Sequence, residues 1–344
     1  MSSAALDRLL AALIVGLAAT GGISLLSGAP AESWLFLLHD VLAGMLAVAV
    51  VAKLARSAPK AIRARRWARL AVAGLVTAAA GASVLAGVAW VAAGSIVWVD
   101  LGLIRWSLLT VHAVAGIALL PLVLGHLAPR RWRVLRVRPA RRAGHATASS
   151  RPTLPRRTLL AAAGYSALAV VLVGTATTVD TLRGGARRFT GSRFLPQGPP
   201  GVPTTFLGEA VPVIDPSGWR LKVTGRVERE LTLELGALMT LDVRDSTAVL
   251  DCTSGWAVQA TWTGARLPDV LALAGAAADA ARVDVVSVTG WRASLRATDV
   301  DAMLLAWAEG GARIGTDHGA PLRLVAPDHR GLEWVKWIDR IEVA

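Results

Sequence analysis

Cysteine is almost missing from this chain of 344 residues, which contains only Cys252. One cysteine excludes a disulfide bond within the chain. A single cysteine is most often a small buried residue, but it can also be a surface thiol, a nucleophile or a metal ligand. The surrounding sequence, LDCTSGWAVQATW at residues 250–262, decides among these roles once the rest of the chain is considered.

Charged residues are also scarce, at 18%, whereas 54% of the residues are hydrophobic and the mean hydropathy is +0.51. The chain is therefore more apolar than an average soluble domain. Acidic residues are absent from two basic blocks, residues 53–69 and 130–157, which hold seven and ten Lys or Arg residues. Basic blocks beside apolar runs are typical of the loops that orient membrane proteins. We therefore expect contact with membrane lipid and no nucleic-acid partner, although the net charge is +13.

Five apolar stretches reach the ~20 residues needed to span a bilayer. The connectors between them alternate in charge: residues 27–33 and 92–105 are nearly free of basic residues, and the other two are the basic blocks. Placing the basic loops inside predicts a cytoplasmic N-terminus, five crossings and an extracytoplasmic C-terminus. The expected spans are residues 6–26, 34–54, 68–91, 106–127 and 158–179.

Histidines inside these spans are candidate functional residues, because ionisable side chains are rare within membranes. His112 and His126 are 14 residues apart, about four helical turns, so they lie on one face of the fourth span. His39 in the second span is expected at the depth of His112, near the outer surface. Two imidazoles at one depth are the ligand set of a b-type haem. The alternatives are hydrogen bonds between helices or contact with a quinone head group, and His126 is a candidate for a second haem or a quinone site.

These spans and histidines make residues 6–127 similar to the small four-helix membrane cytochromes b. The fifth span is preceded by LPRRTLL at residues 154–160. Adjacent arginines before an apolar run resemble a twin-arginine export signal, and simple anchoring by positive charge is the equal alternative. An export signal would imply that the following domain folds before it crosses the membrane.

The composition changes after residue 180. Residues 181–203 are rich in Gly, Pro and Arg and are expected to form a linker. The remaining ~140 residues have the mixed texture of a soluble domain that can bury its own core. Expected strands cover residues 219–225, 248–252, 283–288, 322–325 and 338–343, and expected helices cover residues 233–240, 267–281 and 297–308.

The expected architecture is therefore multi-domain, with an all-α five-helix transmembrane bundle followed by a mixed α+β domain. The membrane part divides into a four-helix domain and a separate fifth helix. The proposed boundaries are 1–130 for the four-helix domain, 131–157 for a basic cytoplasmic linker, 158–180 for the fifth helix, 181–203 for the second linker and 204–344 for the extracytoplasmic domain.

Residues 204–344 also contain an ordered set of short motifs. They are CxxxW from Cys252, WxGxxLxxVL from Trp262, TGW from Thr289, HGAPLRLVAP from His318 and VKWI from Val335. In this order they resemble the molybdopterin-binding domain of the sulfite oxidase superfamily, and most of all bacterial members such as the periplasmic methionine sulfoxide reductases. The resemblance implies a sulfite-oxidase-like fold with a molybdenum cofactor.

The resemblance also implies a role for each matched residue. Cys252 would be the catalytic thiolate ligand of molybdenum, which suits a soft metal. Arg323 would bind the phosphate of the cofactor through its fixed fork of donors. For residues 334–336 the alternative is a strand with a surface lysine. The further cofactor contacts that it implies are Thr204, Leu207, Gly208, Thr289, His318, Trp334, Val335 and Lys336.

Departures from the family pattern fall around the same site. His318 stands where members often carry asparagine, and the chain contains no asparagine. Thr204 and Leu207 replace an asparagine and a tyrosine that are frequent in the family. The Arg-rich run that follows the cysteine in sulfite oxidases is replaced by TSG at residues 253–255, which argues against an anionic sulfite pocket. Two residues could still supply positive charge there, His329 and Arg330.

Together these features predict a multi-pass molybdenum–molybdopterin oxidoreductase in the cytoplasmic membrane. It would transfer an oxygen atom on a small substrate outside the cytoplasm, and a b-type haem would exchange its electrons with quinone or quinol. Reduction of an S-oxide or N-oxide and oxidation of a sulfur compound would use the same parts. The alternatives are an inactive anchored cofactor-binding or sensor protein, and a membrane cytochrome with a structural appendage.

Overall fold

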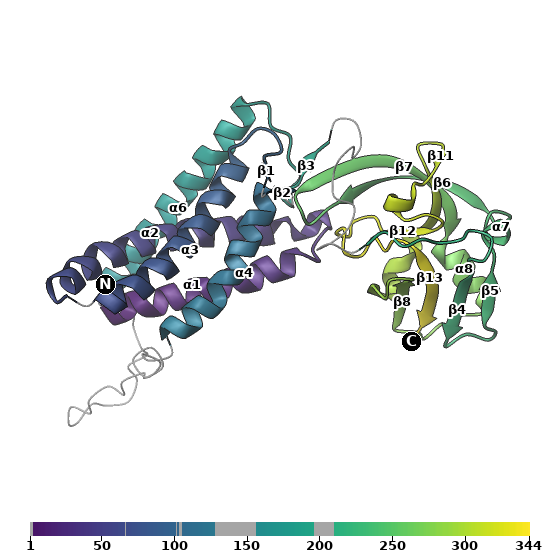
Figure 1. The fold of residues 1–344 in the computed structure, drawn as a ribbon, viewed down its shortest axis with the longest axis horizontal. Coiled ribbons are helices and arrows are strands. Elements are labelled where there is room, and N and C mark those ends of the chain that lie inside the picture. Colours follow the sequence, from purple (N-terminus) through teal and green to yellow (C-terminus); the bar gives the residue numbers. More distant parts are fainter. Residues whose placement is uncertain (1–2, 66, 101, 103–104, 128–155, 196–209) are drawn as a thin grey trace, which may run out of the picture. The chain divides into compact units, whose positions relative to one another are not determined.

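The computed structural model describes residues 3–65, 67–100, 102, 105–127, 156–195 and 210–344 (Figure 1). The chain forms two compact units. One contains Met1–Ser24 and Ser33–Ala186, and the other contains Leu25–Glu32 and Arg187–Ala344. The basic block at 130–155 lies outside the described residues, as do the cofactor contacts expected at Thr204, Leu207 and Gly208.

In its described residues, the first unit contains five helices that are long and apolar enough to cross a membrane, as the sequence predicts. Their large apolar side chains point outward, as for Leu85 and Leu124, which are each 69% exposed. Exposed apolar side chains suit a lipid environment. A helix also satisfies its backbone hydrogen bonds internally, as a membrane span must. The helices are α1 (Ser3–Ser24), α2 (Ser33–Arg63), α3 (Trp67–Val91), α4 (Leu108–Leu127) and α6 (Arg156–Leu182).

Small residues let these helices pack closely. A Cβ atom added to Gly44 of α2 would lie 2.7 Å from the Cβ of Ala169 in α6. Close approach at small residues is the usual way in which membrane helices associate. Leu6 and Leu13 of α1 pack with Leu46 of α2 in one buried cluster. A short hairpin of β1 (Trp98–Asp100) and β2 (Arg105–Ser107) precedes α4.

The second unit is built on two sheets. The six-stranded sheet contains β3 (Arg193–Phe194), β6 (Val243–Asp251), β7 (Trp256–Arg266), β10 (Leu304–Glu309), β11 (Ala312–Arg313) and β12 (Arg323–Val325). The five-stranded sheet has the order β5-β4-β13-β8-β9, formed by Leu231–Leu233, Leu221–Gly225, Ile338–Val343, Arg282–Ser287 and Arg292–Arg296. Two short helices, α7 (Leu235–Leu238) and α8 (Leu267–Ala274), accompany the sheets. This mixed architecture confirms the expected α+β class.

One continuous hydrophobic core joins the two sheets. Residues 283, 285 and 286 of β8 are all buried, and α8 buries Leu267, Val270, Leu271 and Ala274. These four positions follow helical spacing, so the helix presents one apolar face to the core. Residues 25–32 complete the unit. A Cβ atom added to Gly28 would lie 2.7 Å from the carbonyl oxygen of Asp328.

The expected strands at 219–225, 248–252, 283–288, 322–325 and 338–343 correspond to β4, β6, β8, β12 and β13. The prediction of a helix at residues 297–308 was wrong. Those residues form a 3-10 helix, Ala297–Ala302, and then β10, which pairs with β7 and β12. The run LLAWAE is apolar throughout, and a short apolar run has no periodicity that separates a buried strand from a helix.

The helix expected at 267–281 is shorter than predicted. It ends at Ala274 because Gly275 adopts a left-handed conformation with φ of 66° and caps it. The sequence also gave no sign of β9 or of the long strand β7. Residues 187–195, assigned above to a linker, contribute β3 to the six-stranded sheet.

Candidate functional site

Cys252 occupies the turn of the longest hairpin in the described part of the second unit. β6 ends at Asp251 and β7 begins at Trp256, and between them the Cys252 N–H donates to the Trp256 carbonyl at 2.9 Å. Gly255 closes the turn with φ of 99° and donates to the Cys252 carbonyl at 3.0 Å. The thiol is therefore held on a rigid strand end.

The Cys252 thiol is desolvated, and polar groups lie beside it. Desolvation is the largest effect on this thiol and raises its pKa. Hydrogen bonds with Ser254, whose Oγ lies 3.0 Å from the sulfur, and the charge of Arg330 act in the opposite direction. A thiol with a raised pKa is a weaker nucleophile at neutral pH, but it can still bind a metal after losing its proton.

Arg323 is the second element of the site. It begins β12, is only 4% exposed, and lies with its guanidinium carbon 4.8 Å from the ring centroid of Trp262 and 5.7 Å from that of Trp334. Burial lowers its pKa to about 10, and the charge of Glu309 opposes that shift. One of its terminal nitrogens donates to the His318 carbonyl at 2.9 Å.

A glycine brings the matched residues 318–336 together. Gly319 has φ of 112°, and a Cβ atom there would lie 3.1 Å from the Cβ atoms of both Arg323 and Lys336. The side chain of Lys336 extends over Trp337, with Nζ 4.2 Å from the ring centroid. The two cations therefore flank one backbone turn, as a binding site for an anionic group requires.

Thr289 lies in the turn between β8 and β9, next to this cluster. Its hydroxyl is 3.1 Å from the Ser287 hydroxyl, and the neighbouring Val288 N–H donates to the Trp337 carbonyl at 2.9 Å. Residues 334–336 do not form a strand. Trp334 and Val335 are buried, and the Val335 carbonyl accepts from Leu324 of β12. The side chain of His318 faces Glu309, with Nδ1 3.5 Å from the carboxylate.

Backbone contacts connect this cluster to Cys252. A Cβ atom added to Gly331 would lie 3.2 Å from the Cys252 Cα, and the Trp334 N–H donates to the Gly331 carbonyl. The structure thus brings Cys252, Arg323, Lys336 and the Thr289 turn into one region of the domain.

Buried donors in this region fit an absent ligand. Within the described residues, Arg323 Nε, Trp256 Nε1 and Trp262 Nε1 are buried without a hydrogen-bond partner. A buried donor left unpaired costs about 1–3 kcal/mol. Phosphate and heterocycle acceptors would satisfy such donors, so the residues present fit a molybdopterin cofactor.

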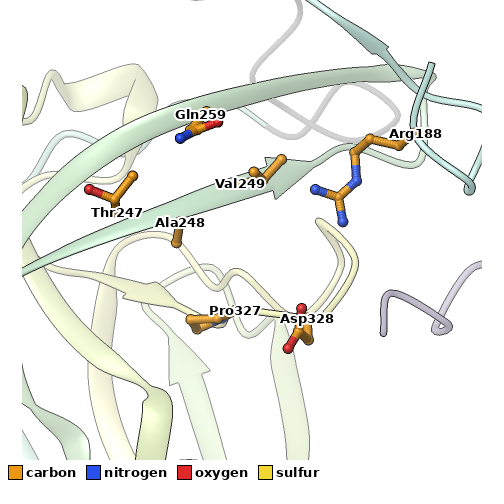
Figure 2. Close-up of a pocket in the computed structure, with 7 residues that line it drawn as sticks. All are labelled: Arg188, Thr247, Ala248, Val249, Gln259, Pro327 and Asp328. Carbon is orange, nitrogen blue, oxygen red and sulfur yellow. The ribbon is translucent and has the colours of Figure 1, made fainter. Parts of the chain in front are cut away.

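A pocket of about 230 Å³ lies beneath the β6–β7 ribbon (Figure 2). Figure 2 shows Arg188 pointing toward the loop that carries Asp328. Arg188 also pairs with Asp251, the residue before Cys252, at 3.0 Å. The pocket is lined by Arg188, Thr247, Ala248, Val249, Gln259, Pro327 and Asp328.

The motifs in the sequence did not predict a role for Asp251, for Arg188 or for the two hydroxyl residues between Arg188 and β3, Thr190 and Ser192. The available signal was an acidic residue at the end of an apolar strand, directly before the cysteine. Arg330, considered only as a source of positive charge, is 3% exposed and lies 3.6 Å from the Asp251 carboxylate. Its charge is therefore matched inside the protein.

The first unit holds the second group of candidate residues. His39 of α2 and His112 of α4 lie with ring centroids 5.9 Å apart and planes at 85°. Nδ1 of His39 lies 2.8 Å from the Thr20 hydroxyl, and Nδ1 of His112 lies 2.7 Å from the Ser83 carbonyl. Within the described residues, both rings form their hydrogen bonds through Nδ1. His126 lies in the last turn of α4.

Comparison with known proteins concerns the second unit. Residues 208–344 match the family described as oxidoreductase molybdopterin binding domain. The chain is 28% identical over 143 residues to an uncharacterized oxidoreductase, YuiH, of Bacillus subtilis, covering 41% of this chain and 72% of that protein. It is 30% identical to sulfite oxidase of Arabidopsis thaliana, covering 39% of this chain and 44% of the relative.

The human mitochondrial sulfite oxidase is 32% identical over 165 residues, covering 39% of this chain and 30% of that enzyme. A solved structure, the sulfane dehydrogenase SoxCD from Paracoccus pantotrophus, is 24% identical, with a TM-score of 0.38 over 39% of this chain and 40% of that one. The chain thus spans less than half of the sulfite oxidases that it matches. Its C-terminal region, residues 208–344, is an oxidoreductase molybdopterin binding domain of the sulfite oxidase family.

Proposed function

We propose that this chain is a membrane-anchored molybdenum oxidoreductase that transfers an oxygen atom to or from a small substrate outside the cytoplasm. Its electrons would be exchanged with the quinone pool through a b-type haem. The observation that carries the proposal is the position of the single cysteine, in a rigid turn within a molybdopterin binding domain. When bound, the cofactor supplies a metal that exchanges electrons and an oxygen atom with substrate.

The protein's own residues would hold this cofactor in two places. Cys252 offers a thiolate, which is a preferred ligand of a soft metal, and its proton would leave on binding. Arg323 offers a desolvated guanidinium whose Nε has no partner among the described residues. Such a fork binds phosphate through paired hydrogen bonds, and Lys336 beside it adds a point charge.

We predict that Arg323→Lys lowers the molybdenum content of the purified chain about tenfold, because lysine cannot form paired charge-assisted hydrogen bonds. Metal analysis of detergent-purified protein measures this. Arg313→Lys, on the exposed strand β11, is the matched control and should keep the wild-type content. Full molybdenum in Arg323→Lys would contradict the role assigned to the guanidinium.

The charges near Cys252 favour an uncharged substrate. Arg330 and Arg188 both pair with Asp251, so much of their positive charge is matched within the protein. The Arg188 pocket also contains the carboxylate of Asp328. A neutral S-oxide or N-oxide would meet less repulsion there than a sulfite dianion. Oxidation of a sulfur compound is the second candidate, favoured by the relatives named sulfite oxidase.

We predict that Cys252→Ser abolishes oxygen-atom transfer, because serine does not replace a soft thiolate ligand. Purified wild-type and variant chains would be assayed with S-oxides and N-oxides under a chemical reductant, and with sulfite under an oxidant. Wild-type protein should contain molybdenum and reduce an oxide. A wild-type chain without molybdenum would defeat the proposal and favour the inactive binding protein.

The proposal of a b-type haem is supported by the histidine pair of the first unit. The two imidazoles, whose ring centroids lie 5.9 Å apart, would hold the iron of such a haem through one nitrogen each. The Nδ1 hydrogen bonds with Thr20 and Ser83 leave Nε2 of each ring for a metal, and such second hydrogen bonds commonly orient ligating histidines.

Glycines make room beside both rings. A Cβ atom added to Gly21 would lie 3.3 Å from Cε1 of His39, and one added to Gly87 would lie 2.9 Å from Nδ1 of His112. Larger residues at these positions would push the rings away from α1 and α3. The glycines therefore support the same ring positions that the hydrogen bonds select.

We predict that the detergent-solubilised chain shows reducible b-type absorption bands, and that His39→Ala and His112→Ala each remove them. Leu124→Ala, at an exposed position of the same helix α4, is the control for a general loss of fold and should retain the bands. Survival of the bands in both ligand variants would refute the assignment.

The charge distribution supports an extracytoplasmic C-terminus. The last turn of α2 carries Lys60 and Arg63, and α6 begins at Arg156. Under the positive-inside rule these ends lie in the cytoplasm. The domain after α6 would then work on the outer side of the cytoplasmic membrane.

We predict that alkaline phosphatase fused after Ala344 is active in cells, because this enzyme folds only outside the reducing cytoplasm. The same reporter fused within residues 131–155 should be inactive. The reverse pattern would overturn the proposed orientation.

A further inference from the structure

Asp251 is a buried carboxylate at the centre of a polar network, and only its pairing with Arg188 and Arg330 has been described so far. It is 1% exposed and ends the strand β6. It accepts hydrogen bonds from the Thr190 hydroxyl at 2.7 Å and the Ser192 hydroxyl at 2.6 Å. The side chains of Arg188 and Arg330 approach it to 3.0 Å and 3.6 Å.

These partners come from two segments far apart in sequence. Arg188, Thr190 and Ser192 precede the residues that match the molybdopterin family, whereas Arg330 lies within them. β3 extends the first segment and pairs in parallel with Trp256 and Ala257 of β7. The stretch that precedes the family domain is thus folded onto the cysteine turn.

The same two segments reach the backbone of Cys252. The Ser192 hydroxyl, which donates to Asp251, shares its hydrogen with the Cys252 carbonyl at 3.3 Å, and this carbonyl also accepts from Arg330 at 3.4 Å and from Gly255 of its own turn. Gly331 donates to the Asp251 carbonyl at 2.7 Å. The peptide group that carries the thiol is therefore held from both sides.

We propose that Ser192 and Arg330, fixed by Asp251, are positioning residues that hold the Cys252 turn in the geometry required for metal ligation. This inference rests on the proposed function, because it concerns the same cysteine. Asp251 neutralises the two buried arginines and orients the hydroxyls. Ser192 and Arg330, held in place by Asp251, in turn hold the Cys252 carbonyl through hydrogen bonds. Thr190 and Arg188 bind Asp251 without touching Cys252.

This division of contacts provides matched variants. Ser192→Ala removes a hydroxyl whose hydrogen is shared between Asp251 and the Cys252 carbonyl, whereas Thr190→Val removes a hydroxyl that donates only to Asp251. Arg330→Lys and Arg188→Lys form a second pair, since both keep a positive charge near Asp251 but only Arg330 donates to Cys252. Asp251 itself is unsuitable, because its removal leaves two buried cations and threatens folding.

The single cysteine provides the readout. In the full-length, detergent-purified chain a thiol reagent labels only Cys252, so its rate reports how often the turn opens or the ligand leaves the metal. We expect Ser192→Ala and Arg330→Lys to be labelled about fivefold faster than wild type, as the loss of one hydrogen bond implies. Thr190→Val and Arg188→Lys should stay within about twofold of wild type.

Thermal unfolding midpoints separate positioning from general stability. Each variant of a pair loses a contact to Asp251, so their midpoints should fall by similar amounts while their labelling rates differ. Equal labelling within both pairs, or no increase in Ser192→Ala and Arg330→Lys, overturns the proposal. Should one variant fail to fold, the other pair decides. Wild-type protein without molybdenum would defeat the proposed function, and the labelling ratios would still test the positioning contacts.

Discussion

The antiparallel pairing of β6 with β7 is the constraint on which the candidate site depends. The register runs from Val243 opposite Ala265 to Asp251 opposite Ala257, and it leaves Cys252 as the first residue of the turn. Because side chains alternate along a strand, a slip of one residue would move Asp251 to the other face of the hairpin. The carboxylate would then lose Thr190 and Ser192, and the turn would lose its support. The position of the thiol is thus a property of the whole hairpin.

The two buried arginines of this region, Arg330 and Arg323, differ in how fully the protein satisfies their guanidinium groups. A guanidinium removed from water needs a compensating charge or hydrogen bonds. Arg330 has the Asp251 carboxylate and the Cys252 carbonyl. Arg323 has the His318 carbonyl and the faces of two tryptophans, and its Nε remains without a partner in the described part of the chain. The first arginine completes the protein's own structure, whereas the second is the one that we propose to bind a ligand.

The first unit follows the same principle with different groups. Apolar helices offer few hydrogen-bonding partners, so each polar side chain among them must be satisfied nearby. Thr20 and Ser83 satisfy one nitrogen each of His39 and His112 and thereby set the direction of both rings. In each unit, a neighbouring helix or strand fixes the group proposed to hold a metal, so the geometry does not rely on the ligand alone.

The sequence by itself determined the features that depend on local composition and order. Five apolar stretches of spanning length predicted the five helices, and the motif series from Cys252 to Lys336 predicted the molybdopterin domain. The histidines in the second and fourth spans were identified from spacing and depth. These features are readable because hydrophobic length and short motifs are local properties of the chain.

The tertiary structure alone decided what depends on contacts between distant segments. The run LLAWAE became β10 because it lies between β7 and β12, which no local periodicity shows. The role of Asp251 as a hydrogen-bond acceptor and ion-pair partner became visible only in the folded structure, where residues 188–192 and 330 surround it. The ring separation of His39 and His112 likewise required α3 to pack against both α2 and α4. Burial and pairing between residues far apart in sequence set these arrangements, and neither is encoded in any single stretch of the chain.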